Sequence, residues 1–500
     1  MGRVPDKPRK SISIGIRLAS FMFVVECGAD ELREFPVAED QSYFRIFDVG
    51  VTDEARSPAG PYAELDALNE LNQRAREMKS ETFEPNKRIR LGLVFFAQLV
   101  SHDLSFMTGV PRGGPIHVSS LNNLRSPLLD LDSIYGGGPG LHPYLYVTDP
   151  VSGQSTGELI TGENVAGEPD LPRAGERRQG GSDVLRFRRA IIGDLRNDET
   201  FPLSQLTLGV LRFHNAEVRR LRERGQGDLS GMNLYRQARR ETTWTVQWLV
   251  VNELIPALCG EVATEISPTD FKLMRDDRIS LPVEFVLACY RVGHAMAPQR
   301  FHLNKIKSPK WLMSHRSSEL VNYANGGRDL PPGWTVQWDL FVPTDGGEPQ
   351  PSATIEQKVA SALFQLPGVP GASRNRALAF RTLAKGYRAE LPSGQALAEF
   401  ARAKGIEIPE REGNDPLWLY ILGEALDHGS GGTHLGPLGA QVVMEVLKSR
   451  ISADEHSYLS EDGWSPRGHS AEAPFSLATF LERAGMPMTK SDVLALQSGG

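Results

Sequence analysis

An apolar segment between Lys87 and Met107 is interrupted by three polar residues, Gln98, His102 and Asp103. Its apolar residues recur mostly at steps of three and four, which predicts a helix packed into a core. Gln98 and His102 are four positions apart and therefore share one face, whereas Asp103 lies about 100° further around the axis. The helix is either part of a buried reaction site or a core helix whose polar groups bond to the backbone.

Composition narrows the classes of partner. The chain has 500 residues, of which 40% are hydrophobic, so it can bury a sizeable core. Its formal net charge of −7 offers no basic footprint, and we expect no nucleic-acid partner. The three cysteines, Cys27, Cys259 and Cys289, include no close pair, so neither a disulfide framework nor a cysteine-based zinc site is predicted.

The N-terminus has some features of a signal peptide. Basic residues at positions 7, 9 and 10 precede an apolar stretch at 12–25, but Arg17 interrupts that stretch and no clear small-residue cleavage pattern follows. The stretch is also too short and too interrupted to span a membrane. We therefore expect a soluble protein without a membrane span, cytoplasmic in preference to secreted.

The remaining pattern predicts a mainly α fold with little β structure. The region 136–181 is rich in glycine, proline and aspartate and predicts extended chain with hairpins. The region 325–345 is irregular apart from a short β-like run at 334–338. We expect an irregular lead-in at 1–40, one large domain at 41–490 and a tail at 491–500. Further helices are predicted at 64–78, 202–223, 229–258, 282–297, 354–363, 373–388, 394–403, 416–426 and 438–450.

Oxygen-bearing groups alternate along the segment from Ser126 to Asp132. The Ser126 hydroxyl, the Leu128 carbonyl and the carboxylates of Asp130 and Asp132 are ligands of the kind that a hard cation such as calcium requires. Asp103, on its own face of the first helix, would supply one more oxygen. The alternative interpretation is a solvated acidic turn.

Two further segments carry groups suited to an anionic or flat ligand. Arg196 lies in a polar loop before a helix, where it can stay charged and donate hydrogen bonds to a developing anion, or simply face solvent. His294 follows Gly293, which lets a flat ligand approach the backbone, and imidazole is a usual ligand of haem iron. Arg291, three residues earlier, is placed to pair with a haem propionate. A core histidine is the alternative.

Together, these four segments resemble the animal-type haem peroxidases of the peroxidase-cyclooxygenase superfamily, and more closely their bacterial members. The resemblance extends from about Tyr43 to Met486 and includes the segments 417–420, 434–439 and 463–464. It implies a mainly α haem-peroxidase domain that binds haem b. It also implies an enzyme that reduces hydrogen peroxide and oxidises small organic donors or halides.

The resemblance assigns a role to each candidate residue. It implies that His102 is the distal acid-base catalyst, with Gln98 as its companion over the haem, and that Arg196 is the distal arginine. His294 matches the proximal iron ligand and Arg291 a propionate partner. A single imidazole can take a proton from the inner peroxide oxygen and return it to the outer one.

The resemblance also implies a structural calcium ion. Its ligands would be Asp103, Ser126, the Leu128 carbonyl, Asp130 and Asp132. Because Asp103 adjoins the distal histidine, calcium would hold the backbone of that residue in register.

Several positions depart from the family pattern. Ser101 stands where mammalian members have an aspartate that forms a haem ester, whereas Glu199 matches the second ester residue, so at most one ester is expected. Thr200 replaces the methionine of the sulfonium link found in one mammalian member. The best alignment puts Thr382 where an asparagine bonds the proximal histidine, and Lys385 where a second arginine pairs with a propionate.

Two other functions remain open. A fatty-acid dioxygenase would carry a radical-forming tyrosine three residues before the proximal histidine, but that position is Arg291, and Tyr290 is rotated from it by about 100°. A haem-binding adhesion or interaction protein with little turnover would have no need of His102 and Arg196.

Overall fold

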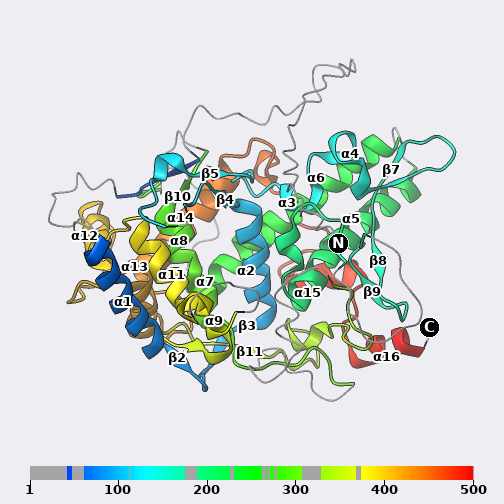
Figure 1. Cartoon of the computed structure of the whole chain (residues 1–500). Coiled ribbons are helices and arrows are strands. Elements are labelled where there is room, and N and C mark those ends of the chain that lie inside the picture. The colour runs from blue at the N-terminus through cyan, green and yellow to red at the C-terminus, as the bar shows by residue number, and fades with distance from the viewer. Residues whose placement is uncertain are drawn as a thin grey trace, which may run out of the picture. The chain divides into compact units, whose positions relative to one another are not determined.

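The computed structural model describes residues 42–47, 61–111, 113–174, 188–225, 230–261, 266, 271–274, 279–306, 328–366 and 373–498. The lead-in predicted at 1–40, with its signal-peptide-like stretch and Cys27, lies outside these residues. The described chain is mainly helical, as the sequence predicts (Figure 1). Its helices are α1 (Pro61–Glu77), α2 (Leu91–Leu104), α3 (Asp132–Tyr135), α4 (Gly138–Leu141), α5 (Phe201–Arg224), α6 (Gly231–Leu249), α7 (Ile255–Cys259), α8 (Val283–Leu287), α9 (Gly293–Met296), α11 (Leu378–Arg388), α12 (Gly394–Ala403), α13 (Leu417–His428), α14 (Pro437–Ser452), α15 (Leu477–Arg483) and α16 (Lys490–Ser498).

The strands are short and join in pairs. Two pairs are parallel, β1 (Tyr43–Phe44) with β10 (Leu281–Pro282) and β2 (Lys79–Ser80) with β12 (Val359–Ala360). The antiparallel pairs are β3 (Pro85–Arg90) with β11 (Pro351–Ala353), β4 (Met107–Thr108) with β5 (Asn122–Asn123), β6 (Tyr146–Thr148) with β7 (Ser155–Leu159) and β8 (Gly162–Glu163) with β9 (Pro169–Asp170). The pairs β6–β7 and β8–β9 confirm the hairpins expected within 136–181.

Helix α2 is held at its start by the backbone of a distant segment. The N–H groups of Leu91 and Gly92 donate to the carbonyls of Gln350 and Phe341, at 3.1 and 2.8 Å. These bonds satisfy donors that the first turn of a helix leaves free. A Cβ atom on Gly92 would lie 2.7 Å from the Phe341 oxygen, so glycine allows this close approach. The position of α2 along its axis is therefore determined by tertiary contacts.

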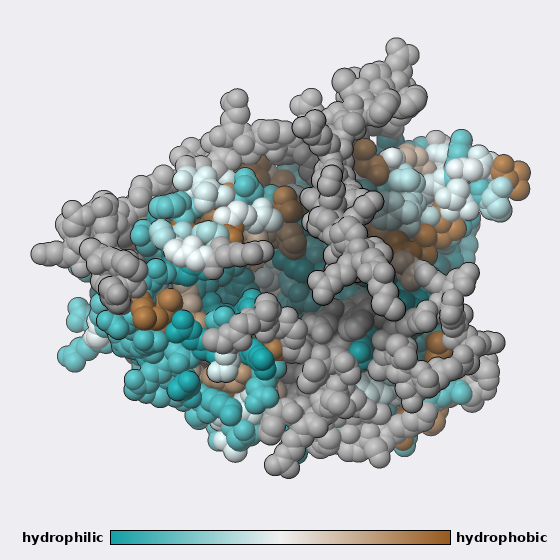
Figure 2. Space-filling view, viewed as in Figure 1, coloured by the Kyte–Doolittle hydropathy of each residue, from teal (hydrophilic) through white to brown (hydrophobic). Residues whose placement is uncertain are grey.

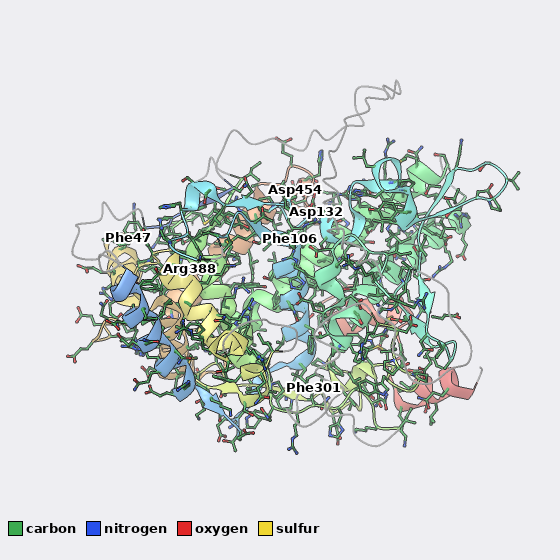
Figure 3. All side chains as sticks on the ribbon, in the orientation of Figure 1. Phe47, Phe106, Asp132, Phe301, Arg388 and Asp454 are labelled. Carbon is green, nitrogen blue, oxygen red and sulfur yellow. The ribbon has the colours of Figure 1, made fainter. Side chains whose placement is uncertain are left out.

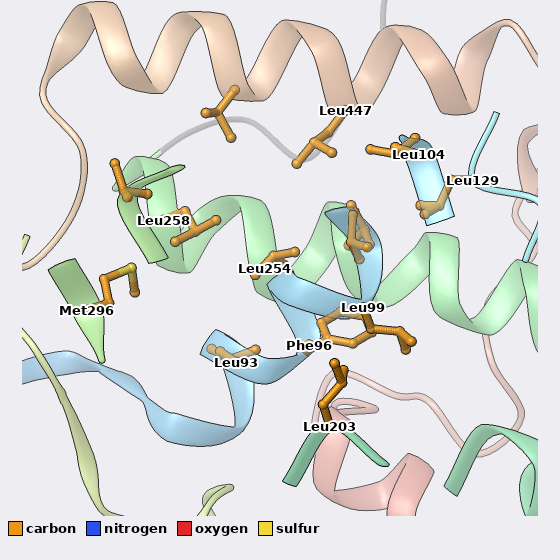
Figure 4. Close-up of a cluster of buried hydrophobic side chains, with 14 of the residues drawn as sticks. Leu93, Phe96, Leu99, Leu104, Leu129, Leu203, Leu254, Leu258, Met296 and Leu447 are labelled. Atoms are coloured by element: carbon orange, nitrogen blue, oxygen red, sulfur yellow. The ribbon is translucent and has the colours of Figure 1, made fainter. Parts of the chain in front are cut away.

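The apolar face of α2 lies in the main core. Leu93, Phe96, Leu99 and Leu104 are all at most 7% exposed, in agreement with the predicted periodicity. Figure 4 shows these side chains packed among residues that come from five other elements. Those residues are Leu203 of α5, Leu254 of the π-helix at Val250–Leu254, Leu258 of α7, Met296 of α9 and Leu447 of α14.

Most predicted helices are confirmed within a few residues. Helices α1, α5, α12, α13 and α14 correspond to the patterns at 64–78, 202–223, 394–403, 416–426 and 438–450. The pattern at 229–258 corresponds to α6, the π-helix and α7, and Pro256 at the start of α7 lacks the N–H that a regular turn needs. The pattern at 373–388 becomes a 3-10 turn followed by α11.

Two predicted helices are wrong in extent. The helix predicted from 87 begins only at Leu91, because residues 85–90 form β3 and pair with β11. The helix predicted at 282–297 is broken into α8, a 3-10 turn at Cys289–Val292 and α9. Side chains satisfy carbonyls near this break: Arg291 Nε donates to Val286 O at 2.8 Å, and Trp418 Nε1 donates to Arg291 O at 3.3 Å.

Two shorter predictions are also wrong. The helix predicted at 354–363 is replaced by β12 and a 3-10 helix at Ser361–Phe364, because Val359 and Ala360 pair with β2. The β-like run at 334–338 forms no strand. The N–H groups of Gln337 and Trp338 donate instead to the carbonyls of Leu303 and Pro487, which belong to irregular segments.

On the face shown in Figure 2, the described residues that are visible are mostly polar. Figure 2 shows a predominantly hydrophilic face on which apolar residues form small separate spots. Among the described helices, none has both the length and the apolar character needed to cross a bilayer.

Candidate functional site

His102 lies near the C-terminal end of α2 and is only 9% exposed. Its Nδ1 lies 3.0 Å from Oδ1 of Asn197, which belongs to the 3-10 helix η4 (Leu195–Asp198). The Asn197 amide also donates through Nδ2 to Ser133 Oγ at 3.5 Å, so Oδ1 is the atom that accepts from His102. The proton therefore sits on Nδ1, and Nε2 keeps its lone pair. Burial, reinforced by the Arg196 charge, lowers the pKa of His102 to about 4.

Arg196 is tied to the end of α2. Its guanidinium donates to the carbonyls of His102 and Ser105 at 2.8 and 2.7 Å, and to the Asp194 carboxylate at 2.7 Å. A cation at this position satisfies carbonyls that the last turn of a helix leaves free. The guanidinium carbon also lies 4.3 Å from the centre of the Phe106 ring, which follows α2 at its upper end in Figure 3. Most of its N–H groups are engaged, which leaves one Nη1 hydrogen without a partner among the described residues.

Gln98 lies one helical turn before His102 on α2 and is half-buried. Helix geometry places it on the same side as His102, as the sequence predicts.

Asp103 points away from His102 into a separate acidic cluster. Its carboxylate accepts from the backbone N–H groups of Leu131 and Ser133 and from the Ser133 hydroxyl, at 2.9, 3.1 and 2.7 Å. Candidate ligand oxygens of Asp103, Asp130 and Asp132 all lie within 4.8 Å of one another. Burial and the Asp130 charge raise the pKa of Asp103 to about 7. The predicted separation of His102 and Asp103 onto different faces is present.

The loop before α3 shapes this acidic cluster. Leu129 and Leu131 have φ values of 54° and 60°, in a left-handed region that leucine rarely adopts. These two residues flank Asp130 and turn the chain sharply on each side of it. The backbone N–H of Ser126 donates to Asp132 Oδ2 at 2.9 Å. Asp132 Oδ1 is buried and has no hydrogen-bond partner within the described chain.

The donor set of this cluster fits a cation. Two guanidinium groups border it, Arg125 at 3.5 Å from Asp132 and Arg239 at 3.6 Å from Asp130, which leaves the three carboxylates with one excess negative charge. Buried carboxylates without matching positive charge favour metal binding, and oxygen ligands suit calcium.

His294 lies in α9, far from His102 in sequence. Its Nδ1 is 3.1 Å from Thr382 Oγ1 of α11, and that hydroxyl donates its own proton to Leu378 O at 3.1 Å. Thr382 therefore accepts the Nδ1 proton, and Nε2 of His294 keeps its lone pair. The Trp418 ring packs edge-on against the imidazole, with ring centres 6.2 Å apart. Burial, with the Arg291 charge, lowers the pKa of His294 to about 3.

Basic groups cluster around Arg291. Lys385, one turn after Thr382 on α11, has its pKa lowered to about 8 by burial and by the charges of Arg291, Arg381 and Arg388. Arg291 and Lys385 form no carboxylate ion pair within the described chain. Such a cluster favours an anionic ligand, because it can supply the missing negative charge.

Glu199 and Tyr43 complete the surroundings. Burial raises the pKa of Glu199, and the charges of Arg196 and Arg291 oppose that effect, so the carboxyl lies near both arginines. Tyr43 is fully buried, its hydroxyl is 2.8 Å from Ser105 Oγ, and burial raises its pKa to about 12.

The structure therefore brings the predicted site residues into two neighbouring groups. One contains His102 and Arg196, and the other contains His294, Arg291 and Lys385. Helices α2 and α9, which carry His102 and His294, pack against each other. Each histidine has its Nδ1 engaged and its Nε2 without a partner among the described residues, and the basic residues lie close by. This combination fits haem, whose iron takes an imidazole nitrogen and whose propionates take cations.

Sequence reasoning missed three contributors, Asn197, Ser133 and Tyr43. Asn197 directly follows Arg196 in a loop whose polarity was noted, so its amide was the available signal. Ser133 and Tyr43 carry no local pattern that distinguishes them from other core residues.

Residues 111–326 match the family model described as animal haem peroxidase. The match includes the acidic loop, Arg196, Glu199, Arg291 and His294, and it begins after His102. Among curated protein sequences, none matches the chain significantly.

Solved structures with a similar fold include peroxidase A from Dictyostelium discoideum, with a TM-score of 0.58 and 15% identity over 85% of this chain and 90% of that one. The fatty acid alpha-dioxygenase of Oryza sativa has a TM-score of 0.53 and 12% identity, with 87% and 80% covered. That of Arabidopsis thaliana has a TM-score of 0.53 and 16% identity, with 85% and 75% covered. At these identities the likeness establishes the fold alone.

Proposed function

We propose that the protein is a haem-dependent peroxidase, on the premise that residues 111–326 match the animal haem peroxidase family model. It reduces hydrogen peroxide and oxidises small organic donors or halides. The observation that carries the proposal is the pair of histidines, one buried and one half-buried, each with its Nδ1 proton held by a side-chain oxygen and its Nε2 without a partner in the described chain. Membership of the bacterial branch stays a prediction.

His294 would hold the iron through Nε2, and Arg291 and Lys385 would pair with the propionates. Haem bound there supplies the iron that binds peroxide and accepts its oxidising equivalents. Thr382 keeps the His294 ring oriented and makes its nitrogen a better donor, because it accepts the Nδ1 proton. Glu199 is the residue able to form a single ester to haem, since Ser101 lacks the carboxyl that a second ester needs.

His102 moves the proton. Its Nε2 takes a proton from the inner peroxide oxygen and delivers it to the outer oxygen. The low pKa of about 4 keeps the imidazole neutral, so it begins the reaction as a base. Asn197 holds the required tautomer, and Arg196 holds the carbonyl of His102 itself at 2.8 Å. Gln98, one turn earlier, orients peroxide beside the imidazole.

Calcium is proposed at the acidic cluster. Asp103, Asp130 and Asp132 supply carboxylate oxygens, and the Ser126 hydroxyl and Leu128 carbonyl complete the set. The excess negative charge of the three buried carboxylates supports this assignment. The role is structural, because Asp103 adjoins His102 and fixes the end of α2.

Replacement of His102 by alanine tests the function. His102→Ala is expected to slow the peroxide-driven change in the haem absorption spectrum by roughly 10²-fold or more, because positioned proton transfer contributes on that order. The haem should remain bound through His294. His428→Ala, at an exposed histidine of α13, is the matched control. Equal rates in His102→Ala and wild type would contradict the assignment.

Fatty-acid dioxygenation is the second candidate, supported by the fold shared with the plant alpha-dioxygenases. The tyrosine nearest to the proximal histidine in sequence, Tyr290, stacks on Phe285 with ring centres 4.8 Å apart, which favours a core role for it. Rapid oxygen uptake with linoleic acid and no added peroxide would favour this function over the peroxidase. A haem spectrum unchanged by peroxide, with no oxygen uptake, would favour a haem-binding protein with little turnover.

A further inference from the structure

A cavity of about 430 Å³ lies behind Thr382 and Trp418. It is bounded by α1, α11, α12 and α13, by the end of α8 and by the segment after β1. Phe47, which lines it, lies on the same side of α2 as these helices in Figure 3. The volume of the cavity falls within the range of roughly 300–1,000 Å³ typical of small-molecule sites. His102, Arg196 and His294 are not among its lining residues.

The inner wall of this cavity touches the proximal histidine. Thr382 lines the cavity and accepts the Nδ1 proton of His294. Trp418 also lines it and packs edge-on against the imidazole, with ring centres 6.2 Å apart. A molecule in the cavity would thus be separated from His294 by a single side chain.

The polarity of the lining changes from floor to mouth. The floor is apolar and buried, with Leu287, Leu383 and Leu417 each 2% exposed. The mouth is polar, and Glu390 and Asn414 are exposed there. This gradient suits a molecule with an aromatic body and a polar end.

Formal charges at the mouth balance, with the cations Arg45 and Arg74 against the carboxylates of Glu390 and Asp415. The Arg45 guanidinium donates to the carbonyls of Ala389 and Glu390 at 2.7 and 2.8 Å. Asp415 pairs with Arg74 at 3.2 Å. The site therefore has no strong preference for an ion, and a neutral ligand fits it best.

We infer that this cavity binds a small neutral aromatic electron donor, a phenol or an aromatic amine. The inference rests on the proposed peroxidase function. Each donor loses one electron and the proton of its O–H or N–H group. The electron passes through Trp418 and His294 to the oxidised haem, and the proton leaves to water at the polar mouth. Two donors are consumed per peroxide, which is reduced to two waters.

Gly386 offers a way to fill the cavity without disturbing the fold. It lies in α11 and lines the cavity, and a Cβ atom there would meet only Leu391 at 3.4 Å or more, an ordinary contact. Leucine also favours a helix more than glycine does. Gly386→Leu thus reduces the space for a ligand. Gly140→Leu, at an exposed glycine of α4 with open space around it, is the matched control.

The first measurement is binding of phenol to the haem-loaded protein without peroxide, by equilibrium dialysis. Gly386→Leu is expected to raise the dissociation constant for phenol about tenfold or more, because the added side chain occupies the site. Gly140→Leu should bind phenol as wild type does. Equal affinity in wild type and Gly386→Leu would overturn the inference.

The second measurement tests the electron-transfer route through Trp418. Trp418→Phe keeps an aromatic ring but loses the readily oxidised indole, so phenol turnover relative to iodide turnover on the same preparation is expected to fall about tenfold. Freeze-quenched wild type mixed with peroxide alone should show an indole radical that Trp418→Phe lacks. An unchanged turnover ratio would overturn the route through Trp418.

The two proposals fail in different ways. If peroxide leaves the wild-type haem spectrum unchanged, the peroxidase function fails, and the phenol-binding comparison still reports on the cavity. If peroxide reacts normally and Gly386→Leu binds phenol as wild type does, the cavity proposal alone fails.

Discussion

Replacement of Asp132 by asparagine should stabilise the protein without calcium and give no net stabilisation with calcium. Asp132 is the clearest position to change, because its Oδ1 accepts no hydrogen bond within the described chain. An amide oxygen can still accept from the N–H of Ser126, which donates to Oδ2 at 2.9 Å. The substitution therefore removes one negative charge with little other disturbance.

The magnitude follows from the distances. Two like charges within 4.8 Å repel by about 3.5 kcal/mol at an effective dielectric constant of about 20, and Asp132 faces two such carboxylates, Asp103 and Asp130. Its attraction to Arg125 at 3.5 Å opposes this by about 4.7 kcal/mol. Burial and the charges of Asp103 and Asp130 raise the pKa of Asp132. At a pH high enough to ionise all three carboxylates, Asp132→Asn is thus expected to stabilise the calcium-free protein by roughly 2 kcal/mol.

Calcium should cancel this difference. At a concentration about 100 times its dissociation constant, calcium stabilises the wild type by about 2.7 kcal/mol. Loss of a charged ligand that weakens binding about 100-fold would reduce this gain to about 0.4 kcal/mol. Thermal unfolding of the haem-loaded proteins should therefore show Asp132→Asn melting higher than the wild type in excess chelator, and the two proteins melting at nearly the same temperature in calcium.

Asp66→Asn, at an exposed aspartate of α1, is the control and should respond to calcium as the wild type does. A wild-type melting temperature that does not change with calcium would refute the cation site. An equal calcium response in Asp132→Asn and wild type would refute the assignment of Asp132 as a ligand.

Three other substitutions test the surroundings of the site. Thr382→Val removes the acceptor of the His294 Nδ1 proton. The haem reduction potential should therefore rise, and the free energy of unfolding should fall by about 1–3 kcal/mol. A reduction potential that spectroelectrochemistry shows to be unchanged would contradict this. Burial raises the pKa of Glu284 to about 7, so its ionisation in the folded protein lowers stability as pH rises from the ordinary carboxyl range through 7. Glu284→Gln should remove up to roughly 3 kcal/mol of that loss between about pH 5 and about pH 8, and an unchanged pH slope of the unfolding free energy would count against it. Gly92→Ala places a Cβ atom 2.7 Å from Phe341 O and should cost about 1–3 kcal/mol in denaturant unfolding, whereas full tolerance would mean that the start of α2 is loosely held.

Local periodicity identified most of the helices, and it failed where distant segments compete. The apolar pattern of α2 continues upstream of Leu91, but residues 85–90 pair with β11, which lies more than 250 residues later in the chain. The pattern at 282–297 is helical throughout, yet the helix breaks before the 3-10 turn, and a side chain from α13 bonds the Arg291 carbonyl. Neither competing partner is visible within the local window from which a helix is predicted.

The same distinction between local pattern and distant contacts applies to the candidate site. Gln98, His102 and Asp103 could be assigned to two faces from their spacing alone, and the faces are as expected. Thr382 was located beside His294 through the family resemblance, and the contact is present. The cavity behind Trp418 could not be foreseen, because five helices and the segment after β1 supply its walls.

The sequence alone determined which chemical groups the protein carries and which helical face each one occupies, because those follow from residue type and a repeat of three to four residues. Only the tertiary structure decided which tautomer each histidine holds. Asn197 is 95 residues from His102 and Thr382 is 88 residues from His294, so packing alone brings each oxygen to its imidazole. The physical reason is that hydrogen-bond partners of buried side chains are chosen by distance in space, which local patterns do not encode.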